Sequence, residues 1–126
     1  RVYLAGPSCM EAEADGKRVV GINEEELKVP GCISRHMEDS GLPLYISLDK
    51  DILNRSCAVT NWDQGETQLE DVLACIKEAA SCRRIIGVDV CGEEPEQEGI
   101  RASQINQNTN REIICKLMEV CGILCP

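Results

Sequence analysis

Two aspartates stand one residue apart where an apolar stretch of the sequence ends. In the segment LYISLDKDILN, residues 44–54, alternating apolar residues lead into Asp49 and Asp51. Side chains two residues apart on an extended chain point to the same side, so the two carboxylates would meet at one spot. Two converging negative charges repel each other unless a cation lies between them. The spacing therefore predicts a site for a metal ion or a lysine where a strand ends.

Four short apolar segments are typical of strands. They cover residues 1–6, 18–23, 44–49 and 83–90. Their β-branched and alternating residues favour extended structure, and the first two segments are expected to be buried. The fourth has a continuous apolar centre, which is the pattern of a parallel strand covered on both faces. A short helix is expected within residues 32–40, before Gly41 and Pro43.

Two longer segments have the apolar periodicity of helices. The first is expected from about residue 67 to 81, with Thr67 and Glu70 as a capping box. The second should begin between Ser103 and Asn110 and end at Gly122. The apolar faces are expected to consist of Leu69, Val72, Leu73, Ile76 and Ala80 in the first helix, and of Ile113, Ile114, Leu117, Val120 and Cys121 in the second. A helix between two apolar strands is a βαβ unit, so we expect an α/β fold with a mainly parallel sheet.

Open parallel sheets bind their ligands at the carboxyl ends of the strands. Asp89 stands near the end of the 83–90 segment, so we expect it at the same edge as Asp49 and Asp51. An acid at a strand end can equally form a turn or cap a helix. Both interpretations stay open for Asp89.

The composition excludes several classes of protein. With 126 residues, 43% of them hydrophobic, the chain suits one modest globular domain. A net charge of -9 argues against nucleic acid as a partner, because phosphate backbones are bound by basic surfaces. The sequence contains neither the roughly 20 apolar residues that span a bilayer nor a secretory signal, so we expect no membrane partner and a cytoplasmic location.

Cysteine and histidine offer a weaker signal for a metal. The nine cysteines are odd in number and include no C-x-x-C pair, so we expect reduced thiols that pack as small apolar side chains. His36 is the single histidine, and it stands in the polar segment SRHMEDSG. We interpret it as a solvated surface residue.

The ordered series SLDKDIL, NWDQGETQLEDVL and RIIGVDVCGEEPE resembles the C-terminal part of the arginase family of manganese-dependent ureohydrolases, which share a fold with histone deacetylases. The family has a strand that ends in S-x-D-x-D, matched by Ser47, Asp49 and Asp51. A G-L-T-x-x-E helix start is matched loosely at residues 65–70, and a G-x-D strand end is matched by Gly87 and Asp89. After the second aspartate the family usually has Asp-Pro, where this chain has Asn54 and Arg55.

The resemblance implies that residues 1–126 are one partial domain, the C-terminal part of a three-layer α/β/α fold with a mainly parallel sheet. It implies that Asp49 and Asp51 bind a binuclear metal centre, with Mn²⁺ as the expected ion. Trp62 and Asp63 on the following loop, together with Glu93, are the expected substrate contacts. The reaction implied is hydrolysis of a C–N bond in a small guanidine or amide substrate.

The family's histidine ligands and its catalytic histidine precede the matched region, so no catalytic residue is identified in this chain. The isolated chain is therefore expected to be inactive. Its uncovered sheet edge and apolar surface are expected to favour self-association into homo-oligomers.

Two other functions stay open. A haloacid-dehalogenase-type phosphotransferase also has an apolar strand that ends in D-x-D, with the first aspartate as nucleophile, although Ile52 and GVDVCGE fit that pattern poorly. The other alternative is a non-catalytic fragment or binding module whose acids only cap the sheet. Metal titration separates this second alternative from a hydrolase.

Overall fold

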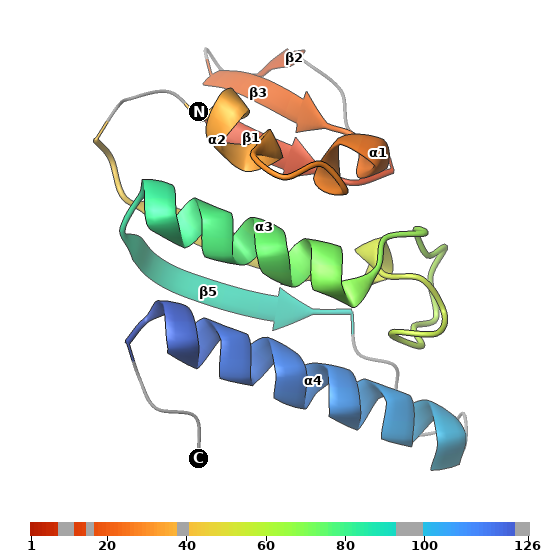
Figure 1. Ribbon diagram of the computed structural model, residues 1–126. Coiled ribbons are helices and arrows are strands. Elements are labelled where there is room, and N and C mark those ends of the chain that lie inside the picture. Colours follow the sequence, from red (N-terminus) through yellow and green to blue (C-terminus); the bar gives the residue numbers. More distant parts are fainter. Residues whose placement is uncertain (8–11, 15–16, 38–40, 93–99, 123–126) are drawn as a thin grey trace.

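The structure is a computed structural model that describes residues 1–7, 12–14, 17–37, 41–92 and 100–122 (Figure 1). The strands are β1 (Val2–Ala5), β2 (Ala12–Ala14), β3 (Lys17–Ile22), β4 (Leu44–Asp49) and β5 (Ile85–Cys91). The helices are α1 (Glu24–Leu27), α2 (Cys32–His36), the 3-10 helix η1 (Lys50–Ile52), α3 (Leu69–Cys82) and α4 (Ile100–Val120). The described part of the chain therefore has the expected α/β class, with all four predicted strands present.

The strands form two small sheets. In the first, β3 lies between β1, which is parallel to it, and β2, which is antiparallel. In the second, β4 and β5 pair in parallel, with Ser47 opposite Asp89 and Asp49 opposite Cys91. Helix α3 connects β4 to β5, so the predicted βαβ unit is confirmed for this pair.

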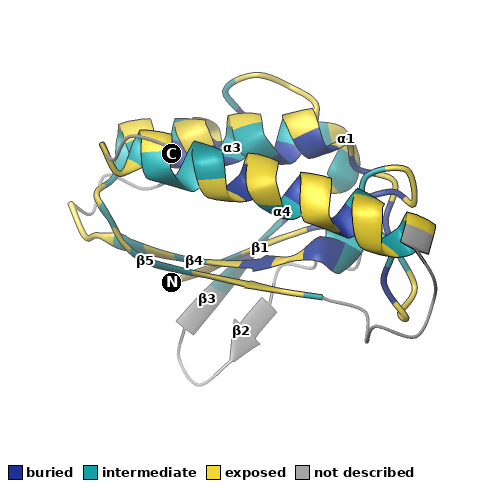
Figure 2. Ribbon diagram, turned by 90° about the horizontal axis from the view of Figure 1, so that it is seen from below, coloured by how far each residue is buried: buried dark blue, intermediate teal, exposed yellow. Residues whose placement is uncertain are grey.

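Helices cover one face of the strands. Viewed from below, α1, α3 and α4 all lie on the same side of the strand layer (Figure 2). On β4, Leu48 is buried on this side, whereas Tyr45, Ser47 and Asp49 are exposed on the other. The expectation that the 83–90 strand is covered on both faces is wrong for the described residues, because Val90 is 40% exposed. Strand β1 is also mostly exposed, against expectation.

Two apolar clusters hold the helices to the strands. The larger lies between β4, the loop after it, α3 and α4, and consists of Leu48, Leu53, Ala58, Leu69, Val72, Ile76 and Ile113. The smaller lies between β3, the two short helices and α3, and consists of Ile22, Leu27, Cys32, Ile33 and Ala79. Helix α3 contributes to both clusters and is therefore the element that joins the two halves of the chain.

The predicted capping box on α3 is wrong. The N-cap of α3 is Gln68, without a side-chain cap bond, and the Thr67 hydroxyl donates to Glu24 Oε1 at 2.7 Å instead. Thr67 is fully buried and bridges to Leu53, so tertiary contacts determine its role. The buried alanine near the end of the helix is Ala79, whereas Ala80 is only half-buried.

A capping box occurs on α1, a helix that the sequence patterns did not predict. The Asn23 side chain accepts from the Glu26 amide at 3.0 Å, and the Glu26 carboxylate accepts from the Asn23 amide at 2.9 Å. Glu26 Oε1 also lies 3.1 Å from His36 Nε2. His36 is therefore half-buried and paired, and the prediction that it is merely solvated is wrong.

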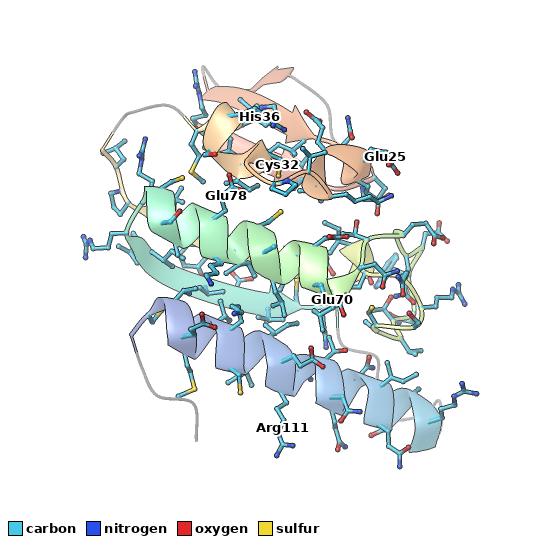
Figure 3. All side chains as sticks on the ribbon, viewed as in Figure 1. Glu25, Cys32, His36, Glu70, Glu78 and Arg111 are labelled. Atoms are coloured by element: carbon cyan, nitrogen blue, oxygen red, sulfur yellow. The ribbon has the colours of Figure 1, made fainter. Side chains whose placement is uncertain are left out.

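Helices α2 and α3 are joined by polar contacts at their exposed side. Glu78 of α3 reaches toward α2 (Figure 3) and accepts bonds from the Ser34 amide at 2.9 Å and the Ser34 hydroxyl at 2.6 Å. Below them, Cys32 Sγ and Cys75 Sγ lie 3.8 Å apart. Burial first, then the neighbouring thiol of Cys32, raises the pKa of Cys75 to about 12, so this thiol stays protonated.

Helix α4 begins at Ile100, before the predicted range of starts. The prediction missed this start because the first turns of the helix combine apolar residues with buried polar ones. Asn106 and Thr109 are buried against the loop at 54–60, and their polarity hides the apolar periodicity there. Ile113 is fully buried as expected, but Ile114 is 54% exposed and Cys121 is exposed. Cys115 is disulfide-bonded, which corrects the expectation of reduced thiols throughout.

Candidate metal site

The turn that carries Asp49 and Asp51 follows β4 directly. Asp49 is the last residue of the strand and the N-cap of η1, and its Oδ1 accepts the Asp51 amide at 3.1 Å. The expectation that both residues lie on one extended segment is therefore wrong. An aspartate readily bonds to a backbone amide two residues on, and this bond ends the strand and starts a turn. The turn determines where the two carboxylates lie.

Asp51 holds a carboxylate oxygen in an unusual environment. Asp51 is half-buried, and its Oδ1 is inaccessible to solvent and has no hydrogen-bond partner among the described residues. A buried oxygen of this kind costs free energy unless a donor or cation contacts it. Of the two aspartates, Asp51 therefore carries the clearer sign of an absent partner.

Lys50, between the two aspartates, points into the helix layer. Its side chain is only 1% exposed, and its ammonium donates to Asn110 Oδ1 of α4 at 3.0 Å. A lysine stands between the two aspartates in the sequence, as expected. Its ammonium, however, bonds to Asn110 and so joins the turn to α4. No described hydrogen bond joins the Lys50 ammonium to Asp51 Oδ1.

Gly92 packs closely against the same turn from the end of β5. A Cβ atom added there would lie 2.5 Å from Asp49 Oδ1 and 3.0 Å from the Lys50 amide nitrogen. The residue also has a φ of 80°, which L side chains rarely adopt. Glycine at this position therefore allows the Asp49 carboxylate to keep its place.

The exposed face of β4 and β5 brings further polar groups to this edge. Asp89 Oδ1 accepts from the Ser47 hydroxyl at 2.8 Å, and a hydrogen bond to Asp89 raises the pKa of Tyr45. The pKa of the Cys91 thiol is also raised, first by burial and then by Asp49, followed by the charges of Asp89 and Asp51. Asp89 thus lies opposite Ser47, two residues before Asp49 along β4, near the edge where it was expected. Its hydrogen bonds favour the structural interpretation of this residue.

The loop between η1 and α3 is held against the turn by backbone and side-chain bonds. The Gly65 amide donates to the Asp51 carbonyl at 2.7 Å, and Gln64 Nε2 donates to the carbonyls of Leu53 and Ala58 at 3.0 and 2.9 Å. Trp62 and Asp63 stand on this loop, both exposed, with Trp62 at 70%. The loop brings them near the turn in sequence, but no bond joins either side chain to Asp49 or Asp51 among the described residues.

The remaining predicted site residue, Glu93, lies outside the described residues. Within the part that the structure describes, no three carboxylate, thiol or imidazole groups are arranged to hold a metal ion. Asp49 and Asp51 together supply hard oxygen donors of the kind that Mn²⁺ and Mg²⁺ prefer. Two carboxylates could supply only part of a ligand set for such an ion, and no third donor is grouped with them among the described residues.

Comparison with known proteins shows a similarity to an uncharacterised bacterial protein. The chain is 31% identical over 100 residues to an uncharacterised protein of Thermotoga maritima. The match covers 79% of this chain but only 38% of that protein. No family model matches the chain, and no solved structure matches it. None of the helices in the described ranges has the length and apolarity needed to cross a bilayer.

Sequence reasoning missed two residues that position the candidate site, Lys50 and Gly92. A lysine between two aspartates gives no sign that its stem is buried, because the sequence of the turn does not show which helix covers it. Gly92 had a recognisable signal, since a glycine directly after a strand often marks a close approach or a left-handed turn.

Proposed function

We propose that the intact protein is a metal-dependent hydrolase of C–N bonds in small guanidine or amide substrates, with Asp49 and Asp51 as part of its metal centre. The observation that carries this proposal is the buried Oδ1 of Asp51, which has no hydrogen-bond partner among the described residues. A cation at this oxygen would remove the cost of burying it. The choice of chemistry comes from the S-x-D-x-D spacing that resembles the arginase family.

In this proposal each residue of the turn has a separate task. Asp49 and Asp51 are oxygen ligands for a divalent ion, with Mn²⁺ as the expected one. A divalent ion bound there would lower the pKa of a water molecule and polarise the substrate. Lys50 holds the turn against α4, and Gly92 leaves room for the Asp49 carboxylate. Trp62 and Asp63, both exposed on the loop after η1, are the proposed substrate contacts.

The proposed architecture of the intact protein is a three-layer α/β/α domain of arginase type, of which this chain is the C-terminal part. Two features support it. The pairs β1–β3 and β4–β5 are parallel, and the face of β4 opposite the helices leaves Tyr45 61% exposed. A further helix layer would cover that face. The Thermotoga maritima relative is long enough to contain such a layer, since this chain spans 38% of it.

A non-catalytic module is the second candidate. It is favoured by the bond from the Asp51 amide to Asp49 Oδ1, because an aspartate that caps a turn already has a structural role. In this alternative the two carboxylates bind no ion.

The test is turnover by the intact protein on a panel of guanidino and acyl-amine compounds with added Mn²⁺. We expect hydrolysis of at least one compound, abolished in Asp49→Ala and Asp51→Ala. Asp63→Ala should keep its metal and change the order of preferred substrates. Equal turnover in the wild type and both alanine variants would contradict the proposal, and so would the absence of any turnover.

A further inference from the structure

An open cavity of about 580 Å³ lies between the loop after η1 and the first turns of α4. Its walls are formed by Arg55, Ser56, Val59, Arg101, Ala102 and Ile105. Neither Asp49 nor Asp51 lines it, so it is separate from the candidate metal site. Two of its six lining residues are arginines that come from distant parts of the chain.

Neither arginine has an acidic partner among the described residues. Both side chains are exposed, and neither forms a hydrogen bond or ion pair within the described residues. This is unexpected in a chain with 22 acidic and 13 basic residues. By contrast, Lys28 and Lys116 each bond to a glutamate three residues away. Within the described part of this acidic protein, the cavity therefore concentrates positive charge that no acidic side chain neutralises.

The walls of the cavity are fixed by buried polar contacts. The Asn106 side-chain amide bonds to both the amide and the carbonyl of Val59, each at 2.8 Å. The Thr109 hydroxyl donates to the Cys57 carbonyl, and Asn106 and Thr109 are each 4% exposed. These bonds fasten the loop that carries Arg55 to the helix that carries Arg101. The backbone on which the two arginines stand is consequently held in place before any ligand arrives, which lowers part of the entropic cost of binding.

The remaining lining is suited to an apolar group. Val59, Ala102 and Ile105 are half-buried and present apolar side chains, while the Ser56 hydroxyl is already bonded to Asn54 Oδ1 at 2.6 Å. Guanidinium groups bind phosphate and carboxylate through paired N–H donors. Arg101 also stands in the first turn of α4, where the helix end disfavours a cation and favours an anion.

We propose that this cavity binds a small organic anion, with its phosphate or carboxylate group between Arg55 and Arg101 and its apolar part against Val59, Ala102 and Ile105. The site is independent of the proposed hydrolase activity, because it shares no residue with the metal site. It gives the protein a second ligand, bound at the junction of α4 and the loop that also carries Trp62 and Asp63.

Calorimetric titration of the intact protein tests the proposal with three probes: phenyl phosphate, inorganic phosphate and benzoate. We expect saturable binding of phenyl phosphate with a Kd on the order of 1 mM, and weaker binding of inorganic phosphate, which lacks the apolar group. Benzoate distinguishes a carboxylate site from a phosphate site, because the tighter of the two aromatic probes identifies the group that the arginines prefer.

Two variants and one matched control complete the experiment. Arg55→Gln and Arg101→Gln should each weaken binding of the preferred aromatic probe by about fivefold, since each removes one charged donor at an exposed site. Arg111→Gln serves as the control, because Arg111 is an exposed arginine on α4 that points away from the body of the molecule (Figure 3) and does not line the cavity. This control should bind like the wild type.

Three results would overturn the proposal. The first is the absence of saturable binding of any probe up to about 20 mM. The second is an equal loss in all three arginine variants, which would indicate only a nonspecific effect of charge. The third is binding that appears only after Glu93, Glu94, Glu96 and Glu98 are changed to glutamine. In that case the arginines would serve the chain's own acidic segment and not a separate ligand.

Discussion

The ammonium of Lys50 donates a hydrogen bond to Asn110 Oδ1 at 3.0 Å, from a side chain that is only 1% exposed. This contact joins the turn that carries the two aspartates to the middle of α4. The position of the candidate metal ligands therefore depends on how α4 packs. A buried charge that is bonded in this way also makes the turn sensitive to truncation of the lysine.

Lys50→Ala should lower the free energy of unfolding by about 3 kcal/mol, because it removes a buried aliphatic stem and a charged hydrogen bond. Lys77→Ala is the matched control, since its ammonium lies 3.9 Å from Glu119 with 66% of its side chain exposed. The control should change stability by less than about 0.5 kcal/mol. Urea unfolding measures both variants, and similar losses in the two would show that Lys50 does not anchor the turn.

Asn106→Ala should lower the free energy of unfolding by about 2–3 kcal/mol. The side-chain amide of Asn106 bonds to both backbone groups of Val59, and its loss leaves a buried donor and acceptor without partners. Gln107→Ala, at the exposed neighbouring position, should have little effect on unfolding. An Asn106→Ala protein as stable as the Gln107→Ala protein would mean that water replaces both bonds.

Gly92→Ala should displace the Asp49 carboxylate, because the new methyl group would lie 2.5 Å from Asp49 Oδ1. Gly122→Ala provides the control for backbone strain, since Gly122 has a similar positive φ of 72° but nothing within 4 Å of an added Cβ. The control should cost about 1 kcal/mol of stability. Gly92→Ala should cost clearly more and should also weaken Mn²⁺ binding, which Gly122→Ala should leave unchanged. Equal behaviour of the two variants in unfolding and in Mn²⁺ titration would contradict this view of Gly92.

The pKa of Glu26 is lowered from its usual 4.5, first by the hydrogen bond from the Asn23 amide and then by His36. A carboxyl group with a lowered pKa stabilises the folded state above the pKa of the unfolded chain. That stabilisation is lost as the pH falls through the folded pKa. The wild type should therefore lose more thermal stability than Glu26→Gln between about pH 7 and about pH 3.

Glu25→Gln is the control for this titration, because its carboxylate pairs with Lys28 at an exposed position, with 82% of the Glu25 side chain accessible. Its melting temperature should follow that of the wild type across the pH range. Parallel curves for the wild type and Glu26→Gln would show that the capping box does not depend on the charge of Glu26.

Much of the fold could be predicted from the periodicity of the sequence. The apolar alternation of residues 44–49 and the helical period after Leu69 both depend on local pattern, and both elements occur as expected. The start of α4 could not be predicted in this way. Asn106 and Thr109 are polar residues buried against a loop, so their burial depends on tertiary hydrogen bonds that leave no apolar signal.

The same distinction applies to the candidate site. The pair Asp49 and Asp51 could be recognised from its spacing, but its geometry was predicted from an extended strand, whereas a capped turn holds the pair. Thr67 was assigned to a capping box because a local motif was present. Its hydroxyl instead bonds to Glu24, a residue far away in the sequence. Local motifs thus identified the chemical groups, and contacts between distant segments determined their partners.

Titration of the intact protein with Mn²⁺ tests the central claim most directly, with Asp51→Asn compared to the wild type and to Asp63→Asn. The asparagine at position 51 keeps the shape of the side chain and removes the charge that would bind the ion. We expect saturable binding by the wild type and by Asp63→Asn, and at least about a tenfold loss of affinity in Asp51→Asn. Unchanged Mn²⁺ affinity in Asp51→Asn would contradict the assignment of the buried Oδ1 of Asp51 to a metal centre.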